Sequence, residues 1–258
     1  MLPLRDRLPA RRVPIVNYLL IALNVIVFGW ERLVIAAGVP APRLLEAYGL
    51  VPAQLMAHPI GGAVNVLTSM FMHDPTSWVH IGGNMLFLWI FGDNVEDALG
   101  RGRYLGFYLL CGLAAALAQV MVGPYSNVPM VGASGAIAGV LAAYGSLYPR
   151  SPITVLNPIP LLWLFFGLFL ELPAWFVILE FFVVNLLYAF GSSSMMGGGV
   201  AFFAHLGGFV AGLFLVRVFL PRAPRREHPR WDGFRSRARR PPPEGYYYTS
   251  PPHRPWDR

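Results

Sequence analysis

The sequence is poor in cysteine and in charged residues, and each shortage excludes a class of protein. Its 258 residues include one cysteine, Cys111, which excludes a disulfide framework and any zinc or iron–sulfur site built from several cysteines. Only 13% of the residues are charged, whereas an ordinary soluble domain has about 25%. Hydrophobic residues make up 55%, which excludes intrinsic disorder for most of the chain. The class that remains is a membrane protein that crosses the bilayer several times.

Six apolar runs are long enough to cross a bilayer as helices. A hydrocarbon core of ~30 Å requires about 20 predominantly apolar helical residues. The runs that approach this length are 15–37, 78–98, 104–122, 132–148, 174–190 and 200–220. A further apolar stretch, 152–172, contains Pro158 and Pro160, and proline removes helical hydrogen bonds. We therefore expect an interfacial or re-entrant connection there, and an all-α membrane protein with a bundle of six transmembrane helices.

The distribution of arginine predicts the orientation of these helices. Lysine is absent, so all 20 basic residues are arginines. Most of them precede the first run, separate the second from the third, follow the fourth or lie in the tail, whereas the segment 38–77 has only Arg43. Cytoplasmic loops carry an excess of basic residues, so both termini are predicted to be cytoplasmic. A seventh span through 161–170 would place the tail outside, and we reject it.

Three parts of the chain follow from these patterns. Residues 1–12 form an Arg-rich cytoplasmic N-terminus, residues 13–220 form the six-helix domain, and residues 221–258 form a disordered, basic cytoplasmic tail rich in proline. A role for this tail in binding lipid or a partner is an alternative to a simply solvated tail. The first apolar run exceeds the 7–15 residues of a signal-peptide core, so we expect an uncleaved helix.

Polar side chains inside membrane spans are energetically costly and are therefore candidate functional groups. Such residues occur in three of the runs: His80 and Asn84 in 78–98, Ser134 in 132–148 and His205 in 200–220. At a rise of ~1.5 Å per residue, the serine and both histidines lie roughly 18–25 Å from the cytoplasmic ends of their helices. The three helices therefore present these groups at a similar depth, below the outer surface of the membrane.

The spacing of small residues favours contact between the serine and one histidine. Gly135 and Gly139 lie on one helix face, and Ala204, Gly208 and Gly212 form a similar series on another helix. Faces of this kind let membrane helices approach closely. Such packing would bring His205 to Ser134, where an imidazole can accept the hydroxyl proton and activate the oxygen as a nucleophile.

A second pair of side chains lies at the same depth. His80 and Asn84 are four residues apart and share a helix face. Their side chains, together with the backbone N–H of Ser134 at a helix N-terminus, are the available donors for a developing oxyanion. A Ser–His pair with oxyanion donors is the arrangement required for acyl transfer.

At these residues the chain resembles the rhomboid family of intramembrane serine proteases. The matching motifs are Gly132-Ala133-Ser134-Gly135, His80-xxx-Asn84 and Ala204-His205-xx-Gly208-xxx-Gly212, and the resemblance covers roughly residues 13–220. It implies that Ser134 is the nucleophile, that His205 is the general base, and that His80 and Asn84 stabilise the oxyanion. It also implies that the helix in 174–190 and the loop 191–199 form the substrate gate and cap.

The resemblance implies a serine endopeptidase that hydrolyses peptide bonds in or near transmembrane segments of other proteins. Its partners would be transmembrane protein substrates and the lipid bilayer, with no nucleic acid, no metal and no cofactor. The expected location is the inner membrane of a bacterial cell. The sequence leaves the oligomeric state and the physiological substrate open.

The chain departs from the family pattern at several positions. Ala138 stands where some members have a tyrosine against the base, so the orientation of His205 is open. Phe181 and Asn185 stand where many bacterial members have tryptophan and glutamine. The segment from His73 to His80 is longer than usual, and His73 is expected to be structural, as is Glu180.

Other functions stay open as alternatives. One is a catalytically inactive rhomboid-like protein that binds membrane clients, although this chain keeps both the serine and the histidine. Another is a transporter or channel, which would require internal repeats and charged pathway residues that we do not find. A zinc protease would require a His-Glu-x-x-His motif, which is absent.

Overall fold

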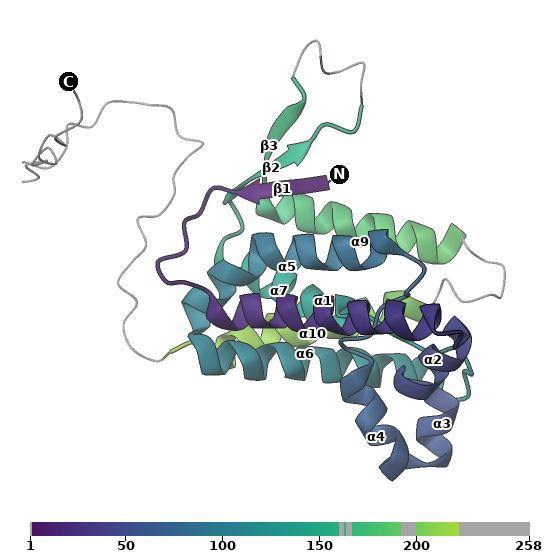
Figure 1. Cartoon of the computed structure of the whole chain (residues 1–258). Coiled ribbons are helices and arrows are strands. Elements are labelled where there is room, and N and C mark those ends of the chain that lie inside the picture. The colour runs from purple at the N-terminus through teal and green to yellow at the C-terminus, as the bar shows by residue number, and fades with distance from the viewer. Residues whose placement is uncertain (1, 160–162, 164–166, 192–199, 222–258) are drawn as a thin grey trace, which may run out of the picture. The chain divides into compact units, whose positions relative to one another are not determined.

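The computed structural model describes residues 2–159, 163, 167–191 and 200–221, and its secondary structure is mostly helical (Figure 1). Each of the six apolar runs coincides with a helix. These helices are α1 (Ile15–Ala36), α5 (Trp78–Leu99), α6 (Arg101–Val122), α7 (Ser134–Leu147), α9 (Ala174–Gly191) and α10 (Val200–Phe219). Most of the loop 191–199 and the tail after 221 lie outside the described residues, so the predicted cap and the predicted disorder of the tail concern segments that the structure does not describe.

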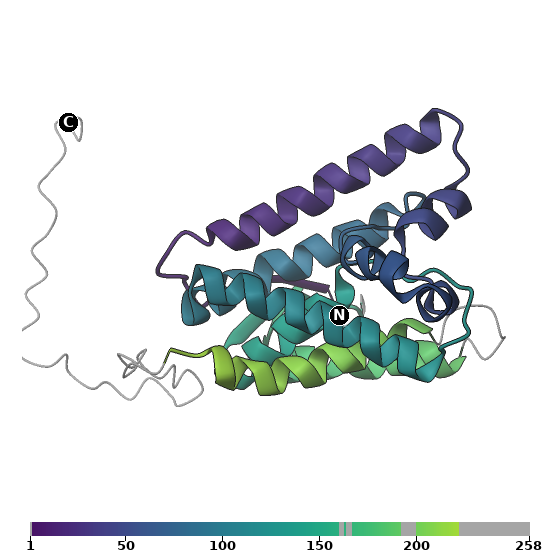
Figure 2. The same ribbon diagram turned by 90° about the horizontal axis from the view of Figure 1, so that it is seen from below.

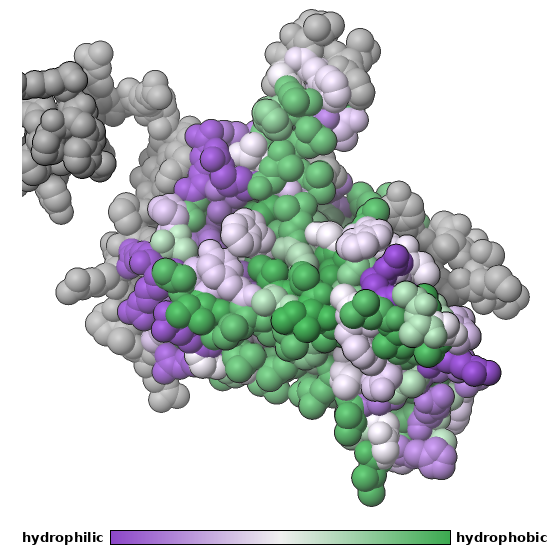
Figure 3. Space-filling view, in the orientation of Figure 1, coloured by the Kyte–Doolittle hydropathy of each residue, from purple (hydrophilic) through white to green (hydrophobic). Residues whose placement is uncertain are grey.

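Among the residues that the structure describes, three stretches of helix are long and apolar enough to cross a bilayer: Ile15–Ala36, Arg101–Val122 and Phe202–Phe219. Helix α7, at 14 residues, is shorter, and α5 carries three acidic residues close to its C-terminal end. Figure 3 shows apolar side chains in a broad band across the displayed face, with hydrophilic side chains gathered toward the two ends of the helices. This distribution is typical of a helical bundle in a membrane.

Helices α6, α7 and α10 pack closely because small residues line their contacts. A Cβ on Gly208 would collide with the backbone carbonyl of Gly135, and one on Gly212 would collide with the backbone of Gly139. The expected approach of α7 and α10 through their glycines is therefore confirmed. Figures 1 and 2 show α6 and α10 side by side, with α1 at one edge of the bundle.

The buried face of α1 combines apolar Leu20 and Phe28 with three polar residues. Asn17, Asn24 and Glu31 recur every seven residues, and all three are fully buried. The Asn17 side chain donates to the backbone carbonyl of Leu88 at 2.9 Å, and its own oxygen accepts from the Tyr104 hydroxyl at 2.8 Å. Hydrogen bonds therefore attach α1 to α5 and α6.

The long segment between the first two apolar runs is not a simple loop. It contains three short helices, α2 (Ala41–Tyr48), α3 (Pro52–Ala57) and α4 (Pro59–Thr68), each with a proline in its first two positions, where the missing N–H costs nothing. They project together from one end of the bundle (Figure 1). After α4 the chain runs through 69–77 into α5, and this stretch contributes to the site described below.

The all-α expectation is wrong in one respect, because the structure contains a three-stranded antiparallel sheet. Strands β2 (Pro152–Leu156) and β3 (Phe169–Pro173) form a hairpin within the stretch expected to be an interfacial or re-entrant connection, and β1 (Leu2–Asp6) pairs with β2. The partner strand β1 lies some 150 residues away along the chain (Leu2 pairs with Leu156), so local pattern could not predict the sheet.

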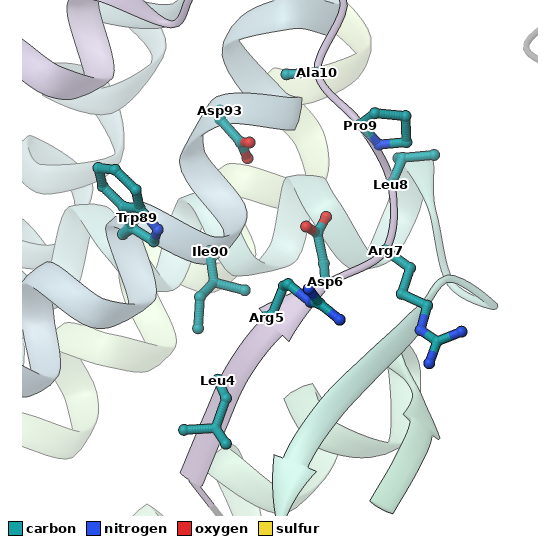
Figure 4. A pocket seen from close by; sticks show the side chains of 10 residues that line it. All are labelled: Leu4, Arg5, Asp6, Arg7, Leu8, Pro9, Ala10, Trp89, Ile90 and Asp93. Carbon is teal, nitrogen blue, oxygen red and sulfur yellow. The ribbon is translucent and has the colours of Figure 1, made fainter. Parts of the chain in front are cut away.

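Strand β1 is attached to the bundle through Asp6. Its carboxylate accepts hydrogen bonds from the Tyr144 hydroxyl on α7 and from the side-chain amide of Asn94 on α5, each at 2.8 Å. An open pocket of about 690 Å³ lies between β1 and α5, and across it Asp6 and Asp93 point toward one another (Figure 4). Because β3 ends at Pro173 and α9 begins at Ala174, the sheet also joins the base of α9 to α5 and α7.

Candidate active site

Ser134 is the first residue of α7 and follows a turn at Gly132 that lies against Ser69. Gly132 has a φ of +124°, a conformation that favours glycine, and its N–H donates to the carbonyl of Ser69 at 2.9 Å. A Cβ at this position would lie only 3.0 Å from Nε2 of His80. The positive φ favours glycine here, a Cβ would also press against the His80 ring, and the turn directs the start of α7 toward the histidines.

The structure brings Ser134 and His205 into hydrogen-bond contact. Nε2 of His205 lies 2.8 Å from Oγ of Ser134, although the two residues are 71 positions apart in the sequence. The close packing of Gly208 against Gly135 explains this contact, because it carries α10 onto the first turn of α7. His205 is nearly buried, at 9% exposure.

The hydrogen bond at Nε2 determines the protonation of the other ring nitrogen of His205, Nδ1. When the Ser134 hydroxyl donates to Nε2, the proton of the neutral imidazole resides on Nδ1. Nδ1 is buried and has no hydrogen-bond partner among the residues that the structure describes. Within this described part of the chain no carboxylate contacts the imidazole, so the observed contact joins two side chains, Ser134 and His205.

An aromatic ring from α9 packs beside the imidazole. The ring centroid of Phe181 lies 6.3 Å from that of His205, and the same ring lies 5.0 Å from Phe87 on α5. Ala138, where some relatives carry a tyrosine, is fully buried and leaves no ring on the α7 side. Phe181 therefore links the histidine to both α9 and α5.

His80 lies beside the serine turn. Its Nε2 atom lies so close to Gly132 that a Cβ added to this glycine would contact it. The ring centroid of His80 lies 5.1 Å from that of His73. The backbone N–H of His80 donates to Oγ of Ser77, the N-cap residue of α5, at 3.3 Å. This cap holds the first turn of α5, and with it His80, against the start of α7.

Asn84 has a partner that the sequence analysis missed. Its side-chain nitrogen lies 3.0 Å from Nε2 of His73, and both residues are buried. His73 lies in the non-helical segment before α5, so helical spacing does not predict that it comes close to His80 or Asn84. The sequence shows only a histidine directly after the apolar stretch Met70–Met72. Its contact with Asn84 becomes apparent only in the folded protein, where His73 is buried.

Among the described residues, the space beside Ser134 and His205 is small. A cavity of about 30 Å³ is lined by Ser134, His205 and residues of the segment 130–132. A volume of this size holds about one water molecule.

A family model, the Rhomboid domain, matches residues 61–222, which is more than half of the chain. The protein belongs to the rhomboid family. The matched region contains all four residues that the sequence analysis singled out, His80, Asn84, Ser134 and His205. The structure also places the serine and the histidine in contact within this rhomboid domain.

Curated rhomboid relatives come from bacteria and from organelles. The chain is 31% identical over 213 residues to the Rhomboid protease GluP of Bacillus subtilis, an alignment that covers 81% of this chain and 36% of the relative. It is 27% identical over 201 residues to Rhomboid protein 1, mitochondrial, of Saccharomyces cerevisiae, covering 76% and 51%. It is also similar to Rhomboid-like protein 11, chloroplastic, of Arabidopsis thaliana, 42% identical over 77 residues, covering 30% and 26%. The chain thus spans about a third to a half of the length of the first two relatives.

Proposed function

We propose that this rhomboid is an intramembrane serine endopeptidase that cleaves the transmembrane segments of other membrane proteins. The observation that carries the proposal is the 2.8 Å contact between Oγ of Ser134 and Nε2 of His205 at the N-terminus of α7. Similarity to a protein named as a rhomboid protease supports it. A serine hydroxyl is a weak nucleophile until an adjacent base accepts its proton, and the dyad supplies that base.

The proposed reaction proceeds through an acyl-enzyme. Oγ of Ser134 attacks the carbonyl carbon of the scissile bond while its proton passes to Nε2 of His205. His205 then donates this proton to the leaving nitrogen as the C–N bond breaks and the acyl group stays on Ser134. A water molecule attacks the ester and His205 accepts one of its protons. His205 then returns this proton to Oγ of Ser134 as the C–O bond breaks and the acid leaves.

The oxyanion that forms in both steps requires hydrogen-bond donors. We assign this role to the side chains of His80 and Asn84 and to the backbone N–H of Ser134. The first turn of a helix has N–H groups without intrahelical acceptors, and the helix dipole favours negative charge there. The contact of His80 with the Gly132 turn supports its place in this group.

The proposed arrangement in the membrane has six spans with both termini cytoplasmic. Arginine distribution supports it, as does the coincidence of the six apolar runs with helices. Helix α9 is proposed as the substrate gate, because the cavity at the dyad is too small for a peptide and the Phe87–Phe181 contact lies between α9 and α5. A bacterial inner membrane is proposed from similarity to a bacterial rhomboid together with the charge asymmetry. Relatives from mitochondria and chloroplasts make an organelle membrane the alternative.

The test is cleavage of a reporter protein with one transmembrane helix, reconstituted with this protein in liposomes. We expect the wild type to cut within or near the helix, as mass spectrometry of the products would show, and Ser134→Ala to leave the reporter intact. Equal cleavage by both proteins would reject the proposal. Stable binding of the reporter without cleavage, and without labelling of Ser134 by a serine-directed phosphonate, would identify a client-binding relative.

A further inference from the structure

We propose that His73 is a positioning residue that fixes the amide orientation of Asn84, so that an N–H group of Asn84, and never its oxygen, faces the oxyanion. This inference rests on the proposed function and assigns a role to a residue that the family motifs of this chain do not include. Its basis is a chain of hydrogen bonds that runs from α1, through His73, to Asn84 on α5.

The tautomer of His73 follows from its neighbours. Nδ1 of His73 lies 3.2 Å from the backbone carbonyl oxygen of Phe71, which can only accept, so Nδ1 carries the proton. A neutral imidazole has one N–H, so Nε2 has a free lone pair directed at Asn84. The side-chain nitrogen of Asn84, 3.0 Å away, is therefore the donor in this contact.

Neutrality of His73 is necessary for this argument, because a charged imidazolium would donate from both nitrogens. Burial lowers the pKa of His73 to about 4, and the nearby His80 contributes in the same direction. His73 is fully buried in the structure. At neutral pH the ring is therefore uncharged and Nε2 is an acceptor.

The consequence for Asn84 is a single amide orientation. One of its two N–H groups is bound to His73, which leaves the other as a donor and prevents the amide from rotating by 180°. A rotated amide would present its oxygen lone pairs to the developing negative charge, so a stabilising group would become a repulsive one. Donors that are already oriented before the reaction are the ones that lower its barrier most.

His73 is itself held from a third helix. Its backbone N–H donates to Oε1 of Glu31 at 2.9 Å, and Glu31 is fully buried on the polar face of α1. The ring of His73 also packs beside His80. One residue therefore contacts both side chains assigned to the oxyanion, and α1 anchors it through the main chain.

The experiment is a double-mutant cycle on kcat and KM in liposomes. The variants are His73→Leu, His73→Gln, Asn84→Ala and the double variant His73→Leu/Asn84→Ala, with the exposed His58→Leu as the matched control. We expect His73→Leu to lower kcat roughly ten- to hundredfold with little change in KM. His73→Gln should retain most activity, because its amide carries both an acceptor and a donor.

The cycle separates positioning from a general structural role. If His73 acts through Asn84, His73→Leu has almost no further effect on kcat once Asn84 is alanine. The same fold loss in both backgrounds, or an equal loss in His73→Gln and His73→Leu, would overturn the inference. An inactive wild type would instead reject the proposed function.

A second measurement tests the inference without activity. Spectra of ¹⁵N-histidine-labelled protein in detergent distinguish a protonated from an unprotonated ring nitrogen, and the loss of one signal set in His73→Gln identifies His73. We expect Nδ1 protonated and Nε2 unprotonated near pH 7. The reverse tautomer, or a doubly protonated ring, would overturn the inference whatever the cleavage assay shows.

Discussion

Helices α5 and α7 carry a polar cluster at each end, and the two clusters differ in how completely their groups are satisfied. At one end, Asp6 accepts from both Tyr144 and Asn94, and the same amide of Asn94 also lies 3.0 Å from a carboxylate oxygen of Asp93. At the other end, Ser134 contacts His205, whose Nδ1 has no partner among the described residues. We call these the sheet-end cluster and the dyad cluster.

The difference matches the roles that we propose for the two clusters, structural at the sheet end and catalytic at the dyad. In the sheet-end cluster the donors and acceptors join β1 to two helices, so removing one group leaves another buried and unpaired. In the dyad cluster the Ser134–His205 contact is one that a reacting substrate can exchange, and the adjacent cavity has room for water. The number of polar residues alone does not distinguish the two clusters, because polar residues interrupt apolar helices in both.

The largest expected effect is on the dyad cluster. His205→Ala should lower kcat by about 10⁴-fold or more, because Ser134 loses its base. Asn84→Ala should cost about 10²–10³-fold and leave measurable cleavage, since one oxyanion donor is removed and others stay. Tyr144→Phe in the sheet-end cluster is the control, and it should reduce stability while leaving kcat within a few-fold of wild type. A comparable loss of kcat in all three variants would erase the distinction between the clusters.

A smaller effect is expected where packing carries one cluster into place. Gly208→Ala adds a Cβ that collides with the backbone of Gly135, so α10 must move away from α7. We expect about 10²-fold lower activity, because displacement of catalytic groups by ~1 Å has that effect. Overpacking should also lower stability by about 1–3 kcal/mol. Gly102→Ala, where nothing lies within 4 Å of the added Cβ, is the matched control.

The activity of these two glycine variants is measured in the same liposome assay, and their thermal unfolding in detergent. Gly208→Ala with wild-type kcat would show that the dyad contact does not depend on this helix packing.

The smallest effect is a pH dependence of stability in the sheet-end cluster. Burial raises the pKa of Asp6 from 3.8 to about 7, the neighbouring Asp93 adds to the rise, and the Tyr144 hydrogen bond opposes it. The folded state therefore favours protonated Asp6, and this contribution to stability is complete below pH ~4 and lost as the pH rises through about 7.

Thermal unfolding at pH 5 and pH 8 measures this dependence. The wild-type melting temperature should fall by a few degrees between the two, whereas Asp6→Asn, which resembles the protonated side chain, should show a flatter profile. A pH profile unchanged by Asp6→Asn would remove the carboxylate from the account of this cluster.

The sequence predicted the helices well, because an apolar run of sufficient length is a local property. It also predicted that Gly135, Gly139, Gly208 and Gly212 would join two helices, since small residues at i and i+4 form one face regardless of the rest of the fold. It did not predict the sheet, because β1 and β2 are brought together from opposite parts of the chain. It also did not predict the contacts of His73 or of the polar residues of α1, because these contacts become apparent only when the side chains are seen to be buried.

The amino-acid order by itself therefore determined which segments are apolar enough to be helices and which rare polar groups they carry. Only the tertiary structure decided which of those groups meet: Ser134 with His205, Asn84 with His73, and Asp6 with Tyr144. The physical reason is that a hydrogen bond forms over about 3 Å, whereas these partners are 71, 11 and 138 residues apart along the chain. Helix packing and strand pairing bring these partners together, and each depends on several segments of the chain at once.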